Sequence, residues 1–241
     1  MKIFLFFILI LIFALTGCGK NPIFSLLPEA VTDGGGQSID LPFEENFDTC
    51  LSFVNGTNGW SISTSGNPEL SIDTTIYKGV RSLKVYYPQG TGTISVKKNF
   101  SPCSKVIAEE YFYSNKKSAI EPVILGLYVN NKLAVSVKRG GLNGMFIVSY
   151  YNTSTETLEQ SGATIMVSAT WYKIKLKLDT TTTPLWTWTL WINDTLELTG
   201  TLNEDKTLSG LVDYFGFEST YTLKDDDDIF YIDEIKVTEE E

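Results

Sequence analysis

The sequence predicts an all-β fold, an antiparallel β-sandwich, for the part of the chain that follows residue 40. Three observations predict it: short β-prone runs alternate apolar and polar residues, turn clusters separate these runs, and helical periodicity is scarce. Residues 41–241 are long enough for one such domain, because sandwiches of roughly 200–250 residues are common. The segment shows no strict internal repeat and no second domain.

The expected strands follow one another at short intervals and are joined by turn residues. Asn130-Asn131 separates two of the runs and Asn193-Asp194 ends another, as is typical of tight hairpin turns. Alternation is clearest near residue 174, where apolar residues alternate with lysines. This pattern predicts a strand with one buried and one solvent-exposed face. The expected strands are 82–86, 93–97, 123–129, 132–138, 145–151, 171–178, 186–193 and 229–237.

The N-terminus carries an export signal. Lys2 precedes an unbroken apolar run from Ile3 to Leu15, which is too short for a membrane-spanning helix of roughly 20 residues. The following Leu15-Thr16-Gly17-Cys18 resembles the lipobox of bacterial lipoproteins. The resemblance implies that residues 1–17 are a signal peptide and that Cys18 becomes the lipidated N-terminus. An ordinary signal peptide with an incidental cysteine is the alternative.

Residues 18–40 are expected to be a flexible tether, since Gly- and Ser-containing stretches open and close them and such linkers behave as flexible coils. Loss of the leader would remove Lys2 and shift the net charge from −10 to −11. An acidic chain repels nucleic-acid phosphates and offers no basic patch to anionic lipid. We therefore expect no nucleic-acid partner, and contact with the membrane only through the lipid anchor. The expected location is the bacterial cell envelope, at the outer membrane or the cell surface.

Two of the three cysteines remain once Cys18 is assigned to lipid. Cys50 and Cys103 would lie in an oxidising compartment, which predicts a disulfide between them. Two free buried thiols are the alternative. The chain contains no histidine, which excludes Ser-His-Asp and Cys-His hydrolases and His-ligated zinc sites.

Several segments together resemble jelly-roll domains of the concanavalin A-like, laminin-G-like and carbohydrate-binding-module type. They are the opening FEENFD at residues 43–48, GVRSLKV at 79–85, TWYKI at 170–174, WTLWIND at 188–194 and FYIDEIKV at 230–237. The resemblance spans residues 43–237. It implies that the first and last strands are neighbours that hold a structural calcium ion, with the ligands Glu45, Asn46, Asp48 and Asp233. A solvent-facing or turn-capping role for Asp233 is the alternative.

The run Asp225-Asp226-Asp227-Asp228 is the densest charge in the chain. It lacks the spaced pattern of known calcium loops, and successive strand positions point to opposite sides. We therefore expect a solvated hairpin tip, with a second calcium loop as the alternative.

Aromatic residues near amides predict a carbohydrate surface, because sugar C–H faces stack on rings while sugar hydroxyls bind amides. Trp186, Trp191, Tyr150 and Asn130 are the candidate ligand-binding residues. The alternative is that the aromatic rings fill the core, which is the expectation for Trp60 and Trp171.

The sequence therefore predicts a non-catalytic, lipid-anchored protein that binds a polysaccharide or other glycan. It contains no Glu-x-Asp-x-x-Glu string of the glucanase type and no histidine for a lyase of this fold, so no catalytic residue is assigned. A structural or adhesive envelope protein with a protein partner is the first alternative. A polysaccharide lyase or glycoside hydrolase with an unusual site is the second.

Overall fold

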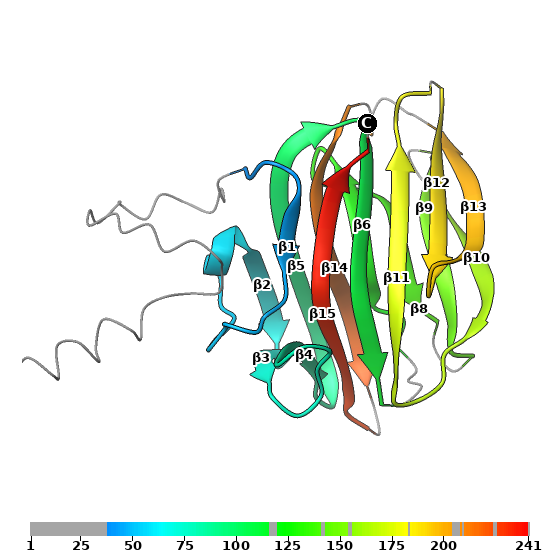
Figure 1. The fold of residues 1–241 in the computed structure, drawn as a ribbon. Helices are drawn as coiled ribbons and strands as arrows, with labels where there is room; N and C mark the ends of the chain where they lie inside the picture. Colours follow the sequence, from blue (N-terminus) through cyan, green and yellow to red (C-terminus); the bar gives the residue numbers. More distant parts are fainter. Residues whose placement is uncertain are drawn as a thin grey trace, which may run out of the picture.

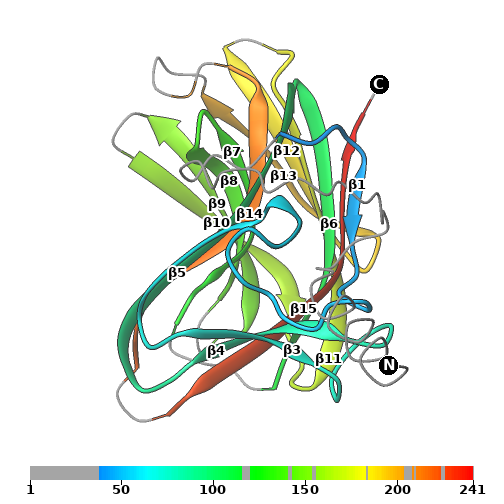
Figure 2. The same cartoon turned by 90° about the vertical axis from the view of Figure 1, so that its left-hand side faces the viewer.

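The computed structural model describes residues 38–115, 120–140, 143–153, 156–182, 184–203, 208, 210–223 and 226–240. They form two β-sheets that face each other in two layers (Figures 1 and 2). Every strand ladder is antiparallel, so the predicted all-β sandwich is confirmed. The predicted signal peptide, Cys18 and the tether up to residue 37 lie outside the described residues.

The eight-stranded sheet contains both the first and the last strand. The short β1 (Phe43–Glu45) pairs with β15 (Asp228–Glu239), as the jelly-roll resemblance implied. The remaining seven strands follow the order β13 (Thr195–Asn203), β12 (Leu185–Ile192), β11 (Thr170–Asp179), β6 (Lys105–Ser114), β15 (Asp228–Glu239), β4 (Ser82–Tyr87) and β3 (Glu69–Asp73).

The seven-stranded sheet forms the second layer. Its order is β10 (Glu156–Ile165), β9 (Met145–Thr153), β8 (Lys132–Arg139), β7 (Val123–Val129), β14 (Val212–Leu223), β5 (Gly90–Cys103) and β2 (Ser61–Gly66). A single turn of 3₁₀ helix, η1 (Thr57–Gly59), precedes β2. Within the described part of the chain no helix has the length and hydropathy of a membrane span.

The core lies between the two sheets and is rich in aromatic rings. Trp60, Trp186 and Trp188 are at most 1% exposed. Trp60 contacts the rings of Phe43, Phe53 and Phe215 at centroid distances of 5.8–6.4 Å. Trp188 packs directly on Gly200 of the neighbouring strand, where a Cβ would lie 2.4 Å from the Trp188 ring. The burial of Trp60 was predicted correctly.

Trp171 lies on the other side of its sheet, contrary to the expectation of a core position. It is half-buried on the outward face of β11, with its ring 5.2 Å from that of Tyr113 on β6. Its neighbour Tyr172 points into the core instead. The alternation along 171–178 therefore places every second side chain outward, and Trp171 follows that pattern.

Two tight turns lie where the sequence predicts them. Asn130 and Asn131 join β7 to β8 with φ values of 51° and 59°, and Asn193 and Asp194 join β12 to β13 with φ values of 51° and 61°. Two successive positive φ values define the type I′ turn that matches the twist of antiparallel strands. Asn and Asp tolerate this conformation better than other non-glycine residues.

A buried ion pair connects the two sheets. Arg139 on β8 and Asp228 at the start of β15 are both fully buried, and both guanidinium NH groups of Arg139 bind the Asp228 carboxylate. Arg139 also donates to the Ser114 hydroxyl, 3.1 Å away, and to the Ile120 carbonyl, 3.3 Å away. These bonds compensate part of the cost of removing two charges from water.

The aspartate run is therefore not a uniformly solvated tip. Asp228 is buried against Arg139, and Asp227 accepts hydrogen bonds from the Tyr86 hydroxyl and the Gln89 N–H at 2.7 and 3.0 Å. Asp225 lies outside the described residues. The sequence could not distinguish these positions because Arg139 is distant along the chain.

The predicted disulfide between Cys50 and Cys103 does not form, because Cys103 is a free, buried thiol. Cys50 lies in the loop after β1, where its carbonyl oxygen accepts a hydrogen bond from Arg81, whereas Cys103 ends β5 opposite Val212 in the other sheet. A disulfide needs Cα atoms within roughly 7 Å of each other. Burial raises the pKa of the Cys103 thiol to about 11.

At one side of the sandwich a carboxylate joins the edge strands of the two sheets. Glu197 on β13 accepts hydrogen bonds from the N–H of Thr164 on β10, at 2.6 Å, and from its hydroxyl, at 2.7 Å. The edges β13 and β10 are thereby connected through a side chain and do not both remain open.

The variant Arg139→Met should lower the free energy of unfolding by about 3–5 kcal/mol, because it leaves the Asp228 carboxylate buried without its partner. Chemical denaturation monitored by intrinsic fluorescence measures the loss. The adjacent Lys138→Met breaks the partly exposed pair with Glu159 and should cost less than about 1 kcal/mol. Equal losses in the two variants would contradict the role given to the buried pair.

Candidate functional site

The structure separates the four residues predicted to bind a glycan. Trp186 is 1% exposed within the core. Tyr150 on β9 packs against the core with its ring 5.2 Å from that of Trp188. Burial therefore removes Trp186 from any ligand surface, and Tyr150 presents its ring to the interior. The alternative of core packing holds for both.

Trp191 and Asn130 are closer to the surface, but they belong to different sheets. Trp191 is half-buried on the outward face of β12, with the Lys175 Nζ 4.8 Å from its ring centroid. Asn130 is exposed in the turn between β7 and β8. The two residues therefore do not form one binding site.

The predicted calcium ligands hold a loop of the protein. One carboxylate oxygen of Asp48 accepts hydrogen bonds from the N–H groups of Val80 and Arg81 at 2.7 and 3.1 Å. Asp233 accepts from the N–H groups of Lys78 and Glu234, both at 2.8 Å. Both carboxylates are thus occupied by the loop that leads into β4.

The other two predicted ligands also have partners within the protein. Glu45 accepts from the side-chain amide of Asn58 at 3.0 Å, and Asn46 accepts from the Asp48 N–H at 3.3 Å. Among the described residues no three Asp, Glu, His or Cys side chains converge closely enough to hold a metal ion. This arrangement does not fit a calcium shell, which needs six to eight oxygen atoms, and calcium binding remains an untested prediction.

Gly79 and Asp233 show how closely the loop is held. A Cβ on Gly79 would lie 2.8 Å from both Asp48 carboxylate oxygens, so only glycine allows this approach. Burial raises the pKa of Asp233 to about 6, although hydrogen bonds from the N–H groups of Lys78, Glu234 and Gly79 lower it.

The variant Asp48→Ala should lower the free energy of unfolding by about 1–3 kcal/mol, because the Val80 and Arg81 N–H groups lose their acceptor. Denaturation in EDTA and in calcium measures whether the loss depends on metal. We expect the same loss in both. A loss seen only in calcium would contradict the loop-holding role and assign Asp48 to a metal.

A cavity of about 580 Å³ lies beside this loop; we call it the acidic cavity. It opens where β15 contains a bulge: Asp233 pairs with Tyr111 and Lys236 with Glu109, so two residues oppose Glu110. Glu234 in the bulge has a φ of 46°. The charged residues that line the cavity are Glu44, Glu45, Asp48, Glu109, Glu110, Glu234, Lys173 and Lys236.

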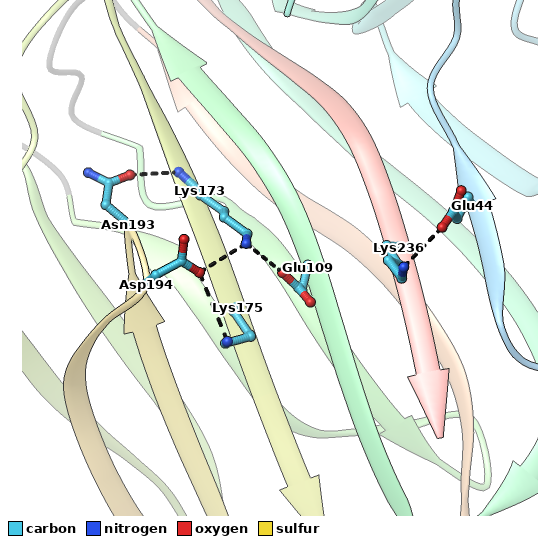
Figure 3. Close-up of polar contacts among 7 residues, drawn as sticks. All are labelled: Glu44, Glu109, Lys173, Lys175, Asn193, Asp194 and Lys236. Atoms are coloured by element: carbon cyan, nitrogen blue, oxygen red, sulfur yellow. Dashed lines mark hydrogen bonds and ion pairs between the residues drawn. The ribbon is translucent and has the colours of Figure 1, made fainter. Parts of the chain in front are cut away.

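The lysines of this region are bound to carboxylates (Figure 3). Lys173 Nζ lies 2.9 Å from Asp194 and 3.1 Å from Glu109, and Lys236 Nζ lies 3.0 Å from Glu44. Asp194 and Glu109 raise the pKa of Lys173, so its ammonium is stabilised. The excess charge of the acidic cavity is therefore negative.

Glu110 is the unusual member of this group. It is fully buried, and neither carboxylate oxygen has a hydrogen-bond partner within the described part of the chain. Burial raises its pKa well above the ordinary value of 4.5. The folded protein therefore retains a proton on Glu110 that the unfolded chain loses as the pH rises.

Replacing Glu110 by Gln should remove a pH-dependent loss of stability. In the native protein the free energy of unfolding should fall as the pH rises above about 4.5, because only the folded state keeps the Glu110 proton. Denaturation curves from about pH 4 to pH 8 compare the two proteins. The free energy of unfolding of Glu110→Gln, relative to that of the native protein, should increase as the pH rises. Parallel pH profiles of the two proteins would contradict a raised pKa of Glu110.

The outward face of the seven-stranded sheet carries a second polar group, the Lys97 cluster, which consists of Lys97, Tyr128, Asn131 and Glu218. Lys97 faces outward on β5 because its neighbours Val96 and Lys98 point inward. Its Nζ lies 3.2 Å from Asn131 Oδ1, 3.7 Å from a Glu218 carboxylate oxygen and 4.2 Å from the Tyr128 ring centroid. Three chemically different groups, an amide, a carboxylate and an aromatic ring, thus meet around one ammonium.

Tyr128 lies beneath the lysine and is 1% exposed. Burial and the neighbouring Glu218 carboxylate both raise the pKa of its phenol. A catalytic base works best with a pKa near the operating pH. Tyr128 is therefore suited to donate a hydrogen bond and poorly suited to abstract a proton.

The register extends this polar surface across neighbouring strands. Tyr214 on β14 lies between Asn99 on β5 and Tyr128 on β7. Further along the same ladder, beyond the pair of Gly216 with Lys97, Glu218 lies opposite Ser95. Tyr214, Asn99, Ser95 and Glu218 are all half-buried, so their polar groups border the Lys97 cluster at the surface.

Sequence reasoning missed the Lys97 cluster. The alternation of Thr93, Ser95 and Lys97 with Ile94 and Val96 was visible, and it placed Lys97 on a polar face. Its partner Tyr128 lies within the apolar run 123–129, where alternation is hidden. The pairing of β14 with both β5 and β7 brings Lys97, Glu218 and Tyr128 together, and no local signal predicts that pairing.

Comparison with known proteins gives no match to a family model and no match among curated proteins. Solved structures do match. An endo-β-1,4-glucuronan lyase from the fungus Trichoderma reesei is 12% identical, with a TM-score of 0.61 over 82% of this chain and 95% of its own. An alginate lyase in complex with alginate trisaccharide is 10% identical, with a TM-score of 0.62 over 85% of this chain and 100% of its own.

The cellulose-induced protein Cip1 is 13% identical, with a TM-score of 0.58 over 81% of this chain and 96% of its own. At such low identities the likeness concerns the fold. The chain has the jelly-roll β-sandwich fold of the concanavalin A-like type, which it shares with the two lyases and with Cip1.

Proposed function

We propose that this protein is a non-catalytic carbohydrate-binding lipoprotein of the bacterial cell envelope. Lys97, Asn131 and Glu218 of the Lys97 cluster form the glycan-binding surface together with the polar residues around them, and the buried Tyr128 supports Lys97 from beneath. The lipid on Cys18 would hold the protein at the outer membrane or the cell surface, and the tether up to residue 40 would let the sandwich reach a nearby polysaccharide.

The chemistry of the Lys97 cluster carries this proposal. Sugar hydroxyls both donate and accept hydrogen bonds, and the cluster offers an ammonium donor with an amide oxygen 3.2 Å and a carboxylate oxygen 3.7 Å from it. The half-buried Tyr214 adds an aromatic ring on which a sugar face can pack. The carbohydrate-active proteins that share this fold make such a ligand the natural expectation.

The raised pKa of Tyr128 supports binding over catalysis. The absence of histidine from the chain removes the most common general base. These two facts favour a binding protein over a lyase or a hydrolase.

Affinity electrophoresis of the purified protein in gels with soluble polysaccharides tests the proposal. Lys97→Ala should reduce glycan affinity roughly tenfold or more, because hydrogen bonds to a charged group are lost. The control Lys177→Ala removes an outward lysine of the other sheet, which pairs with Glu240, and should leave migration unchanged.

Two results would contradict the proposal. If none of the polysaccharides retards the protein, the alternative of a protein partner gains support. If the native protein releases reducing ends or unsaturated products, it is an enzyme. A circular-dichroism spectrum of each variant excludes unfolding as the cause of lost binding.

A further inference from the structure

The ammonium of Lys97 is paired with the carboxylate of Glu218, and this pairing affects which glycans the Lys97 cluster can bind. We propose that the glycan is uncharged and that polyuronates are excluded. This inference rests on the proposed function and concerns the same surface.

The outward lysines of the seven-stranded sheet are paired with carboxylates of the protein. Lys97 lies 3.7 Å from Glu218 on the neighbouring β14. Lys138 on β8 forms an ion pair with Glu159, which lies two strands away on β10. All four side chains are partly exposed, with fractions of 20–45%. Each of these two lysines is therefore matched by a carboxylate of the protein.

The other described cations of this sheet do not reach that face. Arg139 points inward and binds Asp228. Lys98 is buried between the sheets, with its Nζ 5.4 Å from the Phe43 ring and 5.5 Å from the Trp60 ring. Lys132 pairs in register with the core residue Val129, so it lies at the end of the sandwich. Among the described residues, no lysine or arginine on the outward face is left without a carboxylate.

A polyuronate brings one carboxylate with each sugar residue, and a carboxylate must lose water to bind. The loss is compensated only by a cation or by several hydrogen-bond donors. To bind Lys97 it would have to displace Glu218, whose carboxylate would then be left near the ligand's own charge. The net charge of −10 adds repulsion at longer range. Sugar hydroxyls can instead bind to Glu218 and Asn131 with the ion pair intact.

A preference for uncharged glycans would separate the protein from two of its structural neighbours, a glucuronan lyase and an alginate lyase in complex with an alginate trisaccharide. A shared fold does not fix the ligand, because the ligand is chosen by the side chains on the surface. Here the paired carboxylates Glu218 and Glu159 oppose an anionic chain.

Affinity electrophoresis of the full chain at low salt tests the inference, with soluble β-glucan and mannan as neutral probes and alginate and polyglucuronate as anionic probes. The native protein should bind a neutral probe at least about tenfold more tightly than either polyuronate. Stronger binding to a polyuronate would overturn the inference and leave the proposed function standing. Binding to none of the probes would overturn both.

Removal of the opposing carboxylates gives the sharper test. Glu218→Gln and Glu159→Gln each free a lysine while keeping the side-chain shape, so each should increase alginate affinity about fivefold at low salt. The gain should disappear at high salt, because screening weakens the new attraction. Glu239→Gln, at the end of β15 in the other sheet, is the control with the same change in net charge. An equal gain in this control would assign the effect to overall charge and would contradict local exclusion.

Discussion

The structure depends on a single constraint: successive side chains of a strand point to opposite faces of the sheet. In both layers one set of side chains fills the space between the sheets, and the other set remains on the outside. Aromatic residues of β12, β14 and the loop before β2 occupy the interior. The outward positions are left for lysines, carboxylates, amides and tyrosines. The Lys97 cluster exists because β5, β14 and β7 place these outward residues in register.

Two polar features interrupt the apolar interior, and they differ in how they are satisfied. The Arg139–Asp228 pair neutralises its own charges and adds bonds to Ser114 and Ile120. Glu110 has no hydrogen-bond partner among the described residues, and burial raises its pKa well above the ordinary value of 4.5. It lies opposite the bulge of β15, where the ladder between β6 and β15 is interrupted. The same bulge creates the acidic cavity and positions Asp233 to hold the loop before β4.

Local sequence patterns predicted the fold because both the strands and the turns leave local signals. Alternation indicated the strands, and the pairs Asn130-Asn131 and Asn193-Asp194 lie at the turns that they predicted. The pairing of the first strand with the last came from resemblance, since no local pattern joins residues 43–45 to 235–237.

The site was harder to predict because its residues come from distant strands. The run 186–192 carries large apolar side chains on both of its faces, so the pattern could not decide whether Trp186 or Trp191 faces inward. The cysteine pair was chosen by elimination, without knowledge that Cys50 follows β1 of one sheet while Cys103 ends β5 of the other. Lys97 was visible as an outward residue, but only the order β7-β14-β5 reveals its neighbours.

Hydrogen–deuterium exchange with and without a bound soluble glycan tests the central claim that carbohydrate binds the outward face of the seven-stranded sheet. The account predicts slower exchange in the turn at Asn130-Asn131 and in the strands β5, β7 and β14 that carry Lys97, Tyr128 and Glu218. Protection confined to β11 and β12 around Trp191, or to the acidic cavity, would contradict it.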